Sequence, residues 1–390
     1  MGGFGVRFVV FGGWYGSGNI GDDSILIGLR RVLTQAMPGS EVVAISSDPG
    51  QTMRVCGVEA IPLLSPLGRL RRGRSSLDAY YEAFRGADAC IVSGGTPVYD
   101  YGYASRLIHF GFPKALGKRI FCFGIGVKPI RSRVGVRLTR TFLRQADLIS
   151  TRDRPSRDEL VRLGIDRQIS VTGDSALFLA PESHEAGSWK LAECGVDTER
   201  PMVAICPRAL STDHRTHYHE PISAGAISRI RNAVARVADH LSGSGYEVVF
   251  IPMHRDHQDD DLEEIRKITR LMRNRAAKVV GAHLTPGESM AVLGRMTLVF
   301  GLRLHSLVLA ASQGVPVVGV DYDRKIRGFM VLAGVNDFIC RPSDPSGVFV
   351  EKVGKGLGES EALRDRLLRS CDDMKRRILG EAKRLAASLG

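Results

Sequence analysis

The fold is decided by the stretch TLVFGLRLHSLVLAASQGVPVVGVDYDRKIRGF, from Thr297 to Phe329. A short apolar run, Leu298 to Phe300, is followed by a helix-length segment, Leu304 to Ser312, and then, after Gly314, by a second apolar run, Val315 to Val320. Short apolar runs on both sides of a helix-length segment predict a strand–helix–strand unit. Units of this kind build parallel sheets that are covered by helices.

The predicted helix of this unit opens with groups that bind anions. Arg303, Leu304 and His305 bring a cation, a backbone N–H and an imidazole to the carboxyl end of a predicted strand. The N–H groups of a first helical turn attract anions, and open α/β sheets bind ligands at this edge. Beyond the second strand, a polar loop is expected to add cations at the same edge; its charged residues are Asp323, Arg324, Lys325 and Arg327. The stretch therefore predicts an anion site.

Strand and helix segments alternate along the rest of the chain. The first half runs from a predicted strand at Val6–Phe11 to one at Ile169–Thr172, and the second half restarts at Met202–Cys206. This alternation predicts an α/β protein with doubly wound parallel sheets. Because the polar segment 181–200 interrupts it, we expect two Rossmann-like domains that face a cleft. Their expected bounds are residues 1–185 and 200–345.

The C-terminal residues, 359–389, predict one long amphipathic helix, because apolar side chains recur on one side of it. One interpretation is a helix that packs against the protein's own domains. The other is a basic helix that lies on anionic lipid.

Composition limits the partners and the location. The chain has 390 residues and a net charge of +12, which favours a polyanion, an anionic small substrate or an anionic membrane surface. Its 7 cysteines are widely spaced and form no C-x-x-C pair, which is typical of buried free thiols in a reducing compartment. No apolar run reaches the roughly 18 residues of a membrane span. We therefore expect a cytoplasmic protein and leave contact with a membrane surface open.

Three glycine loops follow predicted strands of the first domain, at residues 16–22, 93–96 and 124–126. The spacing of the first loop differs from the G-x-G-x-x-G dinucleotide fingerprint. Since the carboxyl ends of parallel strands share one edge, the loops are expected to line one side of the cleft, with Gly94 and Gly95 in the second.

The first loop also holds candidate ligand-binding residues. Gly18 allows a ligand to approach the backbone closely, and Asn19 and Asp22 could bind sugar hydroxyls. Asp22 could instead act as the N-cap of the helix that follows.

Two arginines directly follow predicted strands. Arg152 follows the strand Leu148–Thr151, and Arg208 follows the strand Met202–Cys206 after one proline. Both are candidates for the cleft, although a solvated helix face is the alternative for Arg152.

Metal and nucleic acid are not expected as partners. No thiol or carboxylate completes a metal-ligand spacing with the histidines at positions 214, 217, 219, 254 and 257. The basic cluster at positions 69, 71, 72 and 74 has no recognition helix or interleaved aromatic residues beside it.

Several of these features belong to segments that occur in a specific order. The segments are GSGNIGDDSIL (16–26), SGGTPVYD (93–100), FGIGVKPI (123–130), TRDRPSRDELVRLG (151–164), VTGDSALFL (171–179) and RLHSLVLAASQGVPVVGVDYDRKIRGF (303–329). In this order the chain resembles the polysaccharide pyruvyl transferase family. It departs from the family at Ser93, where a third glycine is more common.

The resemblance implies a fold, a reaction and site residues. It implies a glycosyltransferase-B-like (GT-B-like) enzyme that moves the pyruvyl group of phosphoenolpyruvate onto saccharide hydroxyls as a ketal, with no cofactor and no metal. The acceptor would be a cell-surface polysaccharide or its lipid-linked precursor. The residues that the resemblance assigns to the donor are Arg303, Leu304 through its backbone, His305 and Lys325, with Arg208 and Arg152 reaching across the cleft.

His305 is the candidate catalytic acid, with Arg303 beside it. Two other functions fit the same architecture. One is a GT-B-type glycosyltransferase that uses a nucleotide sugar, and the other is a non-catalytic protein that binds an anionic metabolite.

Overall fold

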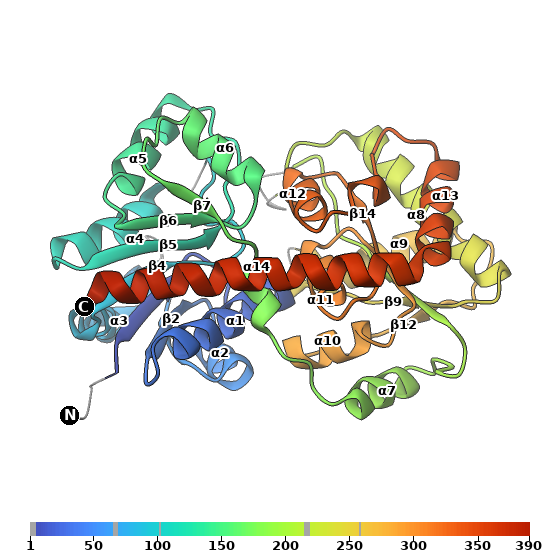
Figure 1. Cartoon of the computed structure of the whole chain (residues 1–390), viewed down its shortest axis with the longest axis horizontal. Helices are drawn as coiled ribbons and strands as arrows, with labels where there is room; N and C mark the ends of the chain where they lie inside the picture. The colour runs from blue at the N-terminus through green and yellow to red at the C-terminus, as the bar shows by residue number, and fades with distance from the viewer. Residues whose placement is uncertain (1–4, 65–68, 101–102, 214–218, 257–258) are drawn as a thin grey trace. The chain divides into compact units, whose positions relative to one another are not determined.

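The computed structural model describes residues 5–390, except 65–68, 101–102, 214–218 and 257–258 (Figure 1). The chain forms two compact units. Unit 1 comprises the residues up to Ser17, residues Asp22–Phe178 and residues Met374–Gly390, and unit 2 comprises Gly18–Gly21 and Leu179–Asp373.

Unit 1 contains a parallel sheet of 7 strands. The strands are β1 (Arg7–Phe11), β2 (Glu41–Ser46), β3 (Glu59–Pro62), β4 (Ala89–Val92), β5 (Arg119–Ile125), β6 (Leu148–Thr151) and β7 (Ile169–Val171). Their order in the sheet is β3-β2-β1-β4-β5-β6-β7. All the strands are parallel, but the order in which they are added to the sheet changes direction between β1 and β4. Doubly wound folds bind ligands at such a switch point.

Helices cover the sheet of unit 1. They are α1 (Ile20–Ala36, of which Ile20 and Gly21 belong to unit 2), α2 (Pro49–Cys56), α3 (Arg69–Gly86), α4 (Tyr103–Ala115), α5 (Arg133–Leu143), α6 (Arg154–Arg162) and the 3₁₀ helix η1 (Ser175–Phe178). The core includes Phe11 of β1, Tyr80 and Phe84 of α3, and Phe110 of α4, all buried. Strand β4 is buried along its length, and β1 and β5 are buried except at Arg7, Arg119 and Gly124, so these strands are mainly apolar.

Unit 2 contains a second parallel sheet, of 6 strands. The strands are β8 (Met202–Cys206), β9 (Glu247–Phe250), β12 (Lys278–Val279), β13 (Leu298–Gly301), β14 (Val317–Val320) and β15 (Ile339–Cys340), and a separate hairpin joins β10 (Arg255–Asp256) to β11 (Asp259–Asp260). The order of the strands in the 6-stranded sheet is β12-β9-β8-β13-β14-β15, which places the switch point between β8 and β13.

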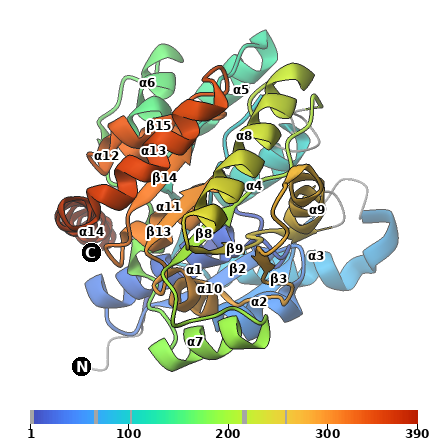
Figure 2. The ribbon, with the colours of Figure 1, turned by 90° about the vertical axis from the view of Figure 1, so that its right-hand side faces the viewer.

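Helices cover both faces of this sheet. The helices are α7 (His184–Glu193), α8 (Ala224–Gly243), α9 (Asp261–Leu271), α10 (Pro286–Leu293), α11 (Leu304–Ala311), α12 (Arg324–Leu332), α13 (Ser346–Gly358) and the 3₁₀ helix η2 (Asn336–Phe338). Helix α8 packs between α9 and α13 (Figure 2), while α11 packs between α10 and α12. Two doubly wound α/β units therefore confirm the predicted fold class.

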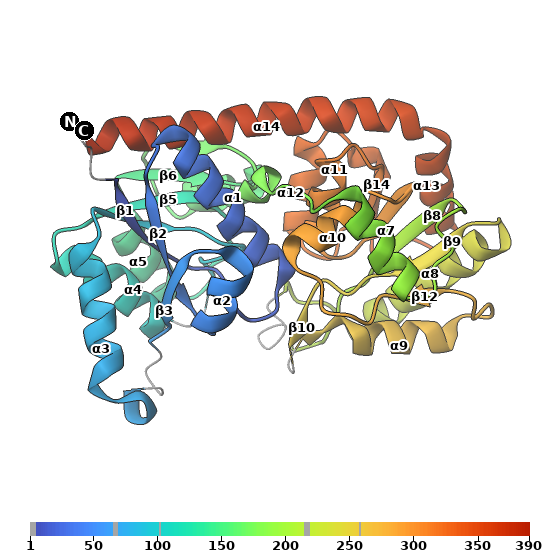
Figure 3. The same cartoon turned by 90° about the horizontal axis from the view of Figure 1, so that it is seen from below.

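The predicted C-terminal helix is also confirmed. Helix α14 runs without interruption from Ser360 to Leu389 (Figures 1 and 3), and its last residues, from Met374 on, belong to unit 1. Leu363 and Leu367 are fully buried in unit 2, and Ile378 and Leu385 are fully buried in unit 1. The apolar side of the helix is thus covered by protein. Among the described residues, the structure contains no helix that is long and apolar enough to cross a membrane.

Two local predictions were wrong. The segment from Asp323 to Arg327 is the start of α12 rather than a loop, since Asp323 is the N-cap and accepts a hydrogen bond from the backbone N–H of Lys325. Asp22 is not an N-cap, because α1 already begins at Ile20. Asn19 precedes this helix, and its side-chain oxygen accepts the N–H of Gly21 at 3.1 Å, as an N-cap does.

Candidate functional site

The predicted anion-site residues of unit 2 follow strands that are neighbours at its switch point. Arg208 follows β8, and Arg303 and His305 follow β13, which pairs with β8. Lys325 follows β14, which pairs with β13 on the other side. Because all three strands are parallel, these residues are brought to one edge of the sheet, where the first turns of α11 and α12 also begin.

Arg303 forms a buried ion pair with Asp261, the first residue of α9. Its Nη2 lies 2.6 Å from Oδ1 of Asp261, and its Nε lies 2.9 Å from Oδ2. The Asp261 carboxylate also accepts the backbone N–H groups of Met253 and His254, each at 3.0 Å. Asp261 is fully buried and Arg303 nearly so. The Nε–Nη2 edge of the arginine, which pairs best with a carboxylate, is therefore occupied by protein.

His305 lies half-buried against the segment Gly18–Gly21. A Cβ atom on Gly21 would stand 1.9 Å from Nδ1 of His305, so a side chain at this position would displace the imidazole. The segment is tied to unit 2 by an antiparallel bridge between Asn19 and His254 and by a hydrogen bond of 3.2 Å from Ile20 N to Met253 O. Gly18 has a φ of 77°, and its O accepts the N–H of Arg255 at 3.4 Å.

Arg208 is buried against Tyr322. Its Nη1 donates to the phenol oxygen at 3.4 Å, and its guanidinium carbon lies 5.9 Å from the ring centroid. Burial raises the pKa of Tyr322 to about 12. The phenol therefore stays neutral at physiological pH, and the positive charge of Arg208 is not cancelled by it.

The histidines that are described do not form a metal centre. His219 uses both ring nitrogens: Nε2 accepts the N–H of Ser211 at 3.1 Å, so Nδ1 donates to the carbonyl of Glu220 at 2.6 Å. Histidines 214, 217 and 257 lie outside the described residues, as do the side chains of the basic cluster at positions 69–74. Within the part of the chain that the structure describes, no group of three or more potential ligands is arranged to hold a metal ion.

The glycine loops of unit 1 interlock at the carboxyl ends of β1, β4 and β5. Asp22 joins two of them, because its carboxylate accepts the N–H of Trp14 at 3.2 Å and the N–H of Gly95 at 2.7 Å. Gly94 has a φ of +115°, and a Cβ atom there would stand 2.3 Å from the Cα of Gly13. The predicted meeting of these loops is confirmed, and the glycines are required by close backbone approach.

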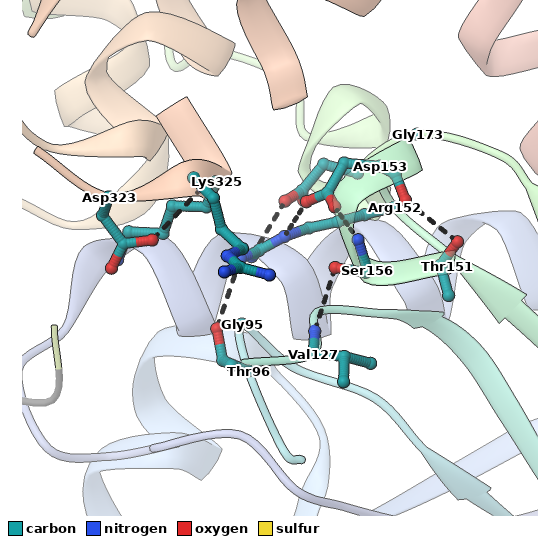
Figure 4. Close-up of polar contacts among 12 residues, drawn as sticks. Gly95, Thr96, Val127, Thr151, Arg152, Asp153, Ser156, Gly173, Asp323 and Lys325 are labelled. Carbon is teal, nitrogen blue, oxygen red and sulfur yellow. Dashed lines mark hydrogen bonds and ion pairs between the residues drawn. The ribbon is translucent and has the colours of Figure 1, made fainter. Parts of the chain in front are cut away.

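Arg152 lies beside the same loops (Figure 4). Its Nη2 donates to the hydroxyl of Thr96 at 3.2 Å, and its Nε lies 3.3 Å from Oδ2 of Asp153. A Cβ atom on Gly126 would stand 2.8 Å from its Nη2. Asp153 in turn caps α6 by accepting the N–H of Ser156 at 2.8 Å. Arg152 is therefore buried at the edge of the sheet rather than on a solvated helix face.

Two residues of the unit 2 site were not predicted, Asp261 and Tyr322. Asp261 stands in the acidic run Asp259–Asp261 directly before a helical pattern, and such a run indicates a solvated helix start. Its partner is 42 positions away in the sequence. Tyr322 stands between two aspartates in a segment that we expected to be a polar loop.

Two doubly wound parallel sheets followed by a long C-terminal helix place the protein in the GT-B-like class. A glycosyltransferase from Rickettsia africae has a TM-score of 0.61 and 10% identity, with 98% of each chain covered. HepE from Anabaena, in complex with UDP and glucose, has a TM-score of 0.60 and 14% identity, with 99% of each chain covered. At these identities the likeness shows a common fold.

The family follows from the sequence comparison. The model of the polysaccharide pyruvyl transferase family matches residues 19–324, and the chain therefore belongs to this family of transferases. The amylovoran biosynthesis protein AmsJ of Erwinia amylovora is 22% identical over 317 residues, which cover 78% of this chain and 73% of that protein. Polysaccharide biosynthesis is thus the setting of the relatives.

Proposed function

We propose that the protein transfers the pyruvyl group of phosphoenolpyruvate to two hydroxyls of a saccharide and so forms a ketal. The observation that carries the proposal is the position of His305. It stands in the first turn of α11, at the switch point of unit 2, at the edge to which Arg208 and Lys325 are also brought. This set supplies an acid and cations at one place.

The donor is a small polyanion, and the site offers it charge and backbone donors. The N–H of Leu304 and the first turn of α11 would hold the phosphate or the carboxylate. Arg208 and Lys325 would neutralise it. Since the Nε–Nη2 edge of Arg303 pairs with Asp261, this arginine would add positive charge beside the donor and would not bind it through that edge.

In the proposed reaction, His305 protonates the methylene carbon of phosphoenolpyruvate. The electron pair of the double bond forms the new C–H bond and leaves a cation at C2, which the first saccharide hydroxyl attacks with loss of its proton. Inorganic phosphate then leaves with the C–O bond electrons. The second hydroxyl attacks C2, loses its proton and closes the ketal, so the products are the ketal and phosphate.

We place the acceptor at the glycine loops. Gly94, Gly95 and Asp22 belong to these loops, and Arg152 lies beside them. Gly18 and Asn19 precede Asp22 in the sequence. The net charge of +12 would suit a diphosphate-linked saccharide, and the amylovoran relative favours a polysaccharide precursor. The reaction would then occur in the cytoplasm, where the donor is made, before the glycan reaches the cell envelope. Any contact with a membrane would come from the acceptor's lipid.

The experiment measures phosphate release from phosphoenolpyruvate in the presence of a pool of bacterial glycan precursors, with the wild type and with His305→Gln. The proposal expects release by the wild type only, and equal calorimetric binding of donor by both. Retained release by the variant would remove His305 as the acid. Binding of UDP- or GDP-sugars in place of phosphoenolpyruvate would identify a glycosyltransferase, and binding without release would identify a non-catalytic protein.

A further inference from the structure

Asp261 holds three loops of unit 2 together at the switch point. Its carboxylate takes two hydrogen bonds from backbone N–H groups after β9, those of Met253 and His254. A third and longer one, at 3.4 Å, comes from Ala209 after β8. The guanidinium of Arg303, after β13, completes the set. One carboxylate thus joins the loops that follow three adjacent strands.

We infer that Asp261 is a positioning residue, which fixes the place of the His305 imidazole without touching the substrate. This inference rests on the proposed function, in which His305 is the acid. It deepens that function, because it names a residue that determines where the acid stands.

The first connection to His305 runs through Arg303. Arg303 is the N-cap residue of α11, and its side chain makes no capping hydrogen bond to this helix. Because Asp261 pins the Arg303 side chain at two atoms, it also fixes the start of α11, and His305 is the second residue of that helix.

The second connection runs through the segment that packs against the ring. Asp261 binds the backbone of Met253 and His254. Met253 in turn accepts the 3.2 Å hydrogen bond from Ile20, and His254 forms the antiparallel bridge with Asn19. Gly21 follows directly and lies against the imidazole. Asp261 therefore fixes both the backbone that bears His305 and the backbone that its ring contacts.

A carboxylate is needed for these contacts, and an amide cannot replace it. All the groups that face Asp261 in these contacts are donors: three backbone N–H groups and the Nε and Nη2 of Arg303. Asparagine offers one acceptor oxygen, and its NH₂ group would face a further donor. The buried Arg303 would then lose its counter-charge, so the loops should shift.

The test compares Asp261→Asn with Asp260→Asn in the full-length protein. Asp260 is a matched control because it is the neighbouring N-cap of α9, which accepts the N–H of Leu262 at 2.9 Å, and asparagine caps helices equally well. The titration of His305 is followed by NMR with ¹³C-labelled histidine in the absence of substrate, and its signal is assigned with His305→Gln. Donor affinity and transfer rate are measured beside it.

We expect Asp261→Asn to change the pH at which His305 titrates and to lower the transfer rate about 100-fold, the effect of a shift of about 1 Å in a reacting group. Donor affinity should change far less than the rate. Asp260→Asn should match the wild type in all three measurements. A folded Asp261→Asn protein with wild-type titration and rate would overturn the inference.

If Asp261→Asn does not melt cooperatively, Asp261→Glu decides. It keeps the charge but moves the carboxylate by one methylene, so an altered His305 titration and an intermediate loss of rate are expected, and wild-type behaviour in both would overturn the inference. The titration needs no substrate. It therefore judges Asp261 even if phosphoenolpyruvate proves not to be the donor.

Discussion

Substitution of Gly21 by alanine tests whether the His305 ring is placed by the segment that packs against it. The new Cβ atom would stand 1.9 Å from Nδ1 of His305, whereas ordinary carbon contacts begin at about 3.4 Å. The ring or the helix start must therefore move by about 1.5 Å. A displacement of about 1 Å costs about 100-fold in rate, or about 2.7 kcal/mol. We expect a loss of phosphate release of at least this size, with a loss of stability of about 1–3 kcal/mol from the overpacking.

The assay is phosphate release under saturating donor, together with denaturant unfolding. Gly354→Ala is the matched control, since a Cβ atom at this helical position of α13 would meet nothing within 4 Å. It should keep full activity and gain up to about 1 kcal/mol of stability. Gly21→Ala introduced into a His305→Ala protein should cost little stability, because the clash is gone. Equal destabilisation in both backgrounds, or full activity of Gly21→Ala, would refute the reasoning.

Three further predictions concern pH, charge and the C-terminal helix. Burial raises the pKa of Asp23 to about 7, so the folded state binds a proton that the unfolded state has lost above about pH 4. The free energy of unfolding should therefore fall as the pH rises from about 4 to 7, by up to about 1.4 kcal/mol per pH unit. Asp23→Asn should flatten this slope in urea titrations. An unchanged slope in the variant would contradict the prediction. Lys325→Met should weaken donor binding, measured by calorimetry, about tenfold, which corresponds to a charge-assisted contact of about 1.4 kcal/mol. Substitution of the exposed Lys267 by methionine should leave the affinity unchanged. Equal donor affinities of Lys325→Met and the wild type would exclude a contact between Lys325 and the donor. Ile378→Ala should destabilise unit 1 by about 2–5 kcal/mol because Ile378 is fully buried. Substitution of the exposed Lys383 by alanine should change the free energy of unfolding by less than about 0.5 kcal/mol. Similar changes in both variants would contradict the packing of α14.

The strands of both sheets could be predicted closely, because parallel strands buried on both faces are continuous apolar runs. Leu148–Thr151 and Met202–Cys206 begin and end where the sequence predicts. The meeting of the glycine loops at one edge also followed, since parallel strands share their carboxyl edge.

Some helices were missed because their local signals are weak or ambiguous. Helix α2, from Pro49 to Cys56, is short, although Asp48 and Pro49 form an N-cap and first-turn signal. Helix α13 contains four glycines in the run SGVFVEKVGKGLG, which lowers helix propensity. Helix α12 begins with charged residues that resemble a loop.

The candidate site could be predicted in part. Arg303, His305, Arg208 and Lys325 follow adjacent strands, and this placement is a consequence of topology. The pairing of Arg303 with Asp261 could not be predicted, because it depends on how the loop after β9 folds back onto the loop after β13. A local pattern contains no information about such a contact.

The most direct test of the central claim is the transfer reaction in D₂O, with the product analysed by NMR and mass spectrometry. If His305 protonates the methylene carbon of phosphoenolpyruvate, each ketal formed by the wild type will carry one deuterium in its methyl group, with one phosphate released per ketal. A saccharide product without a pyruvyl ketal, or a ketal whose methyl group carries no deuterium, would contradict the account.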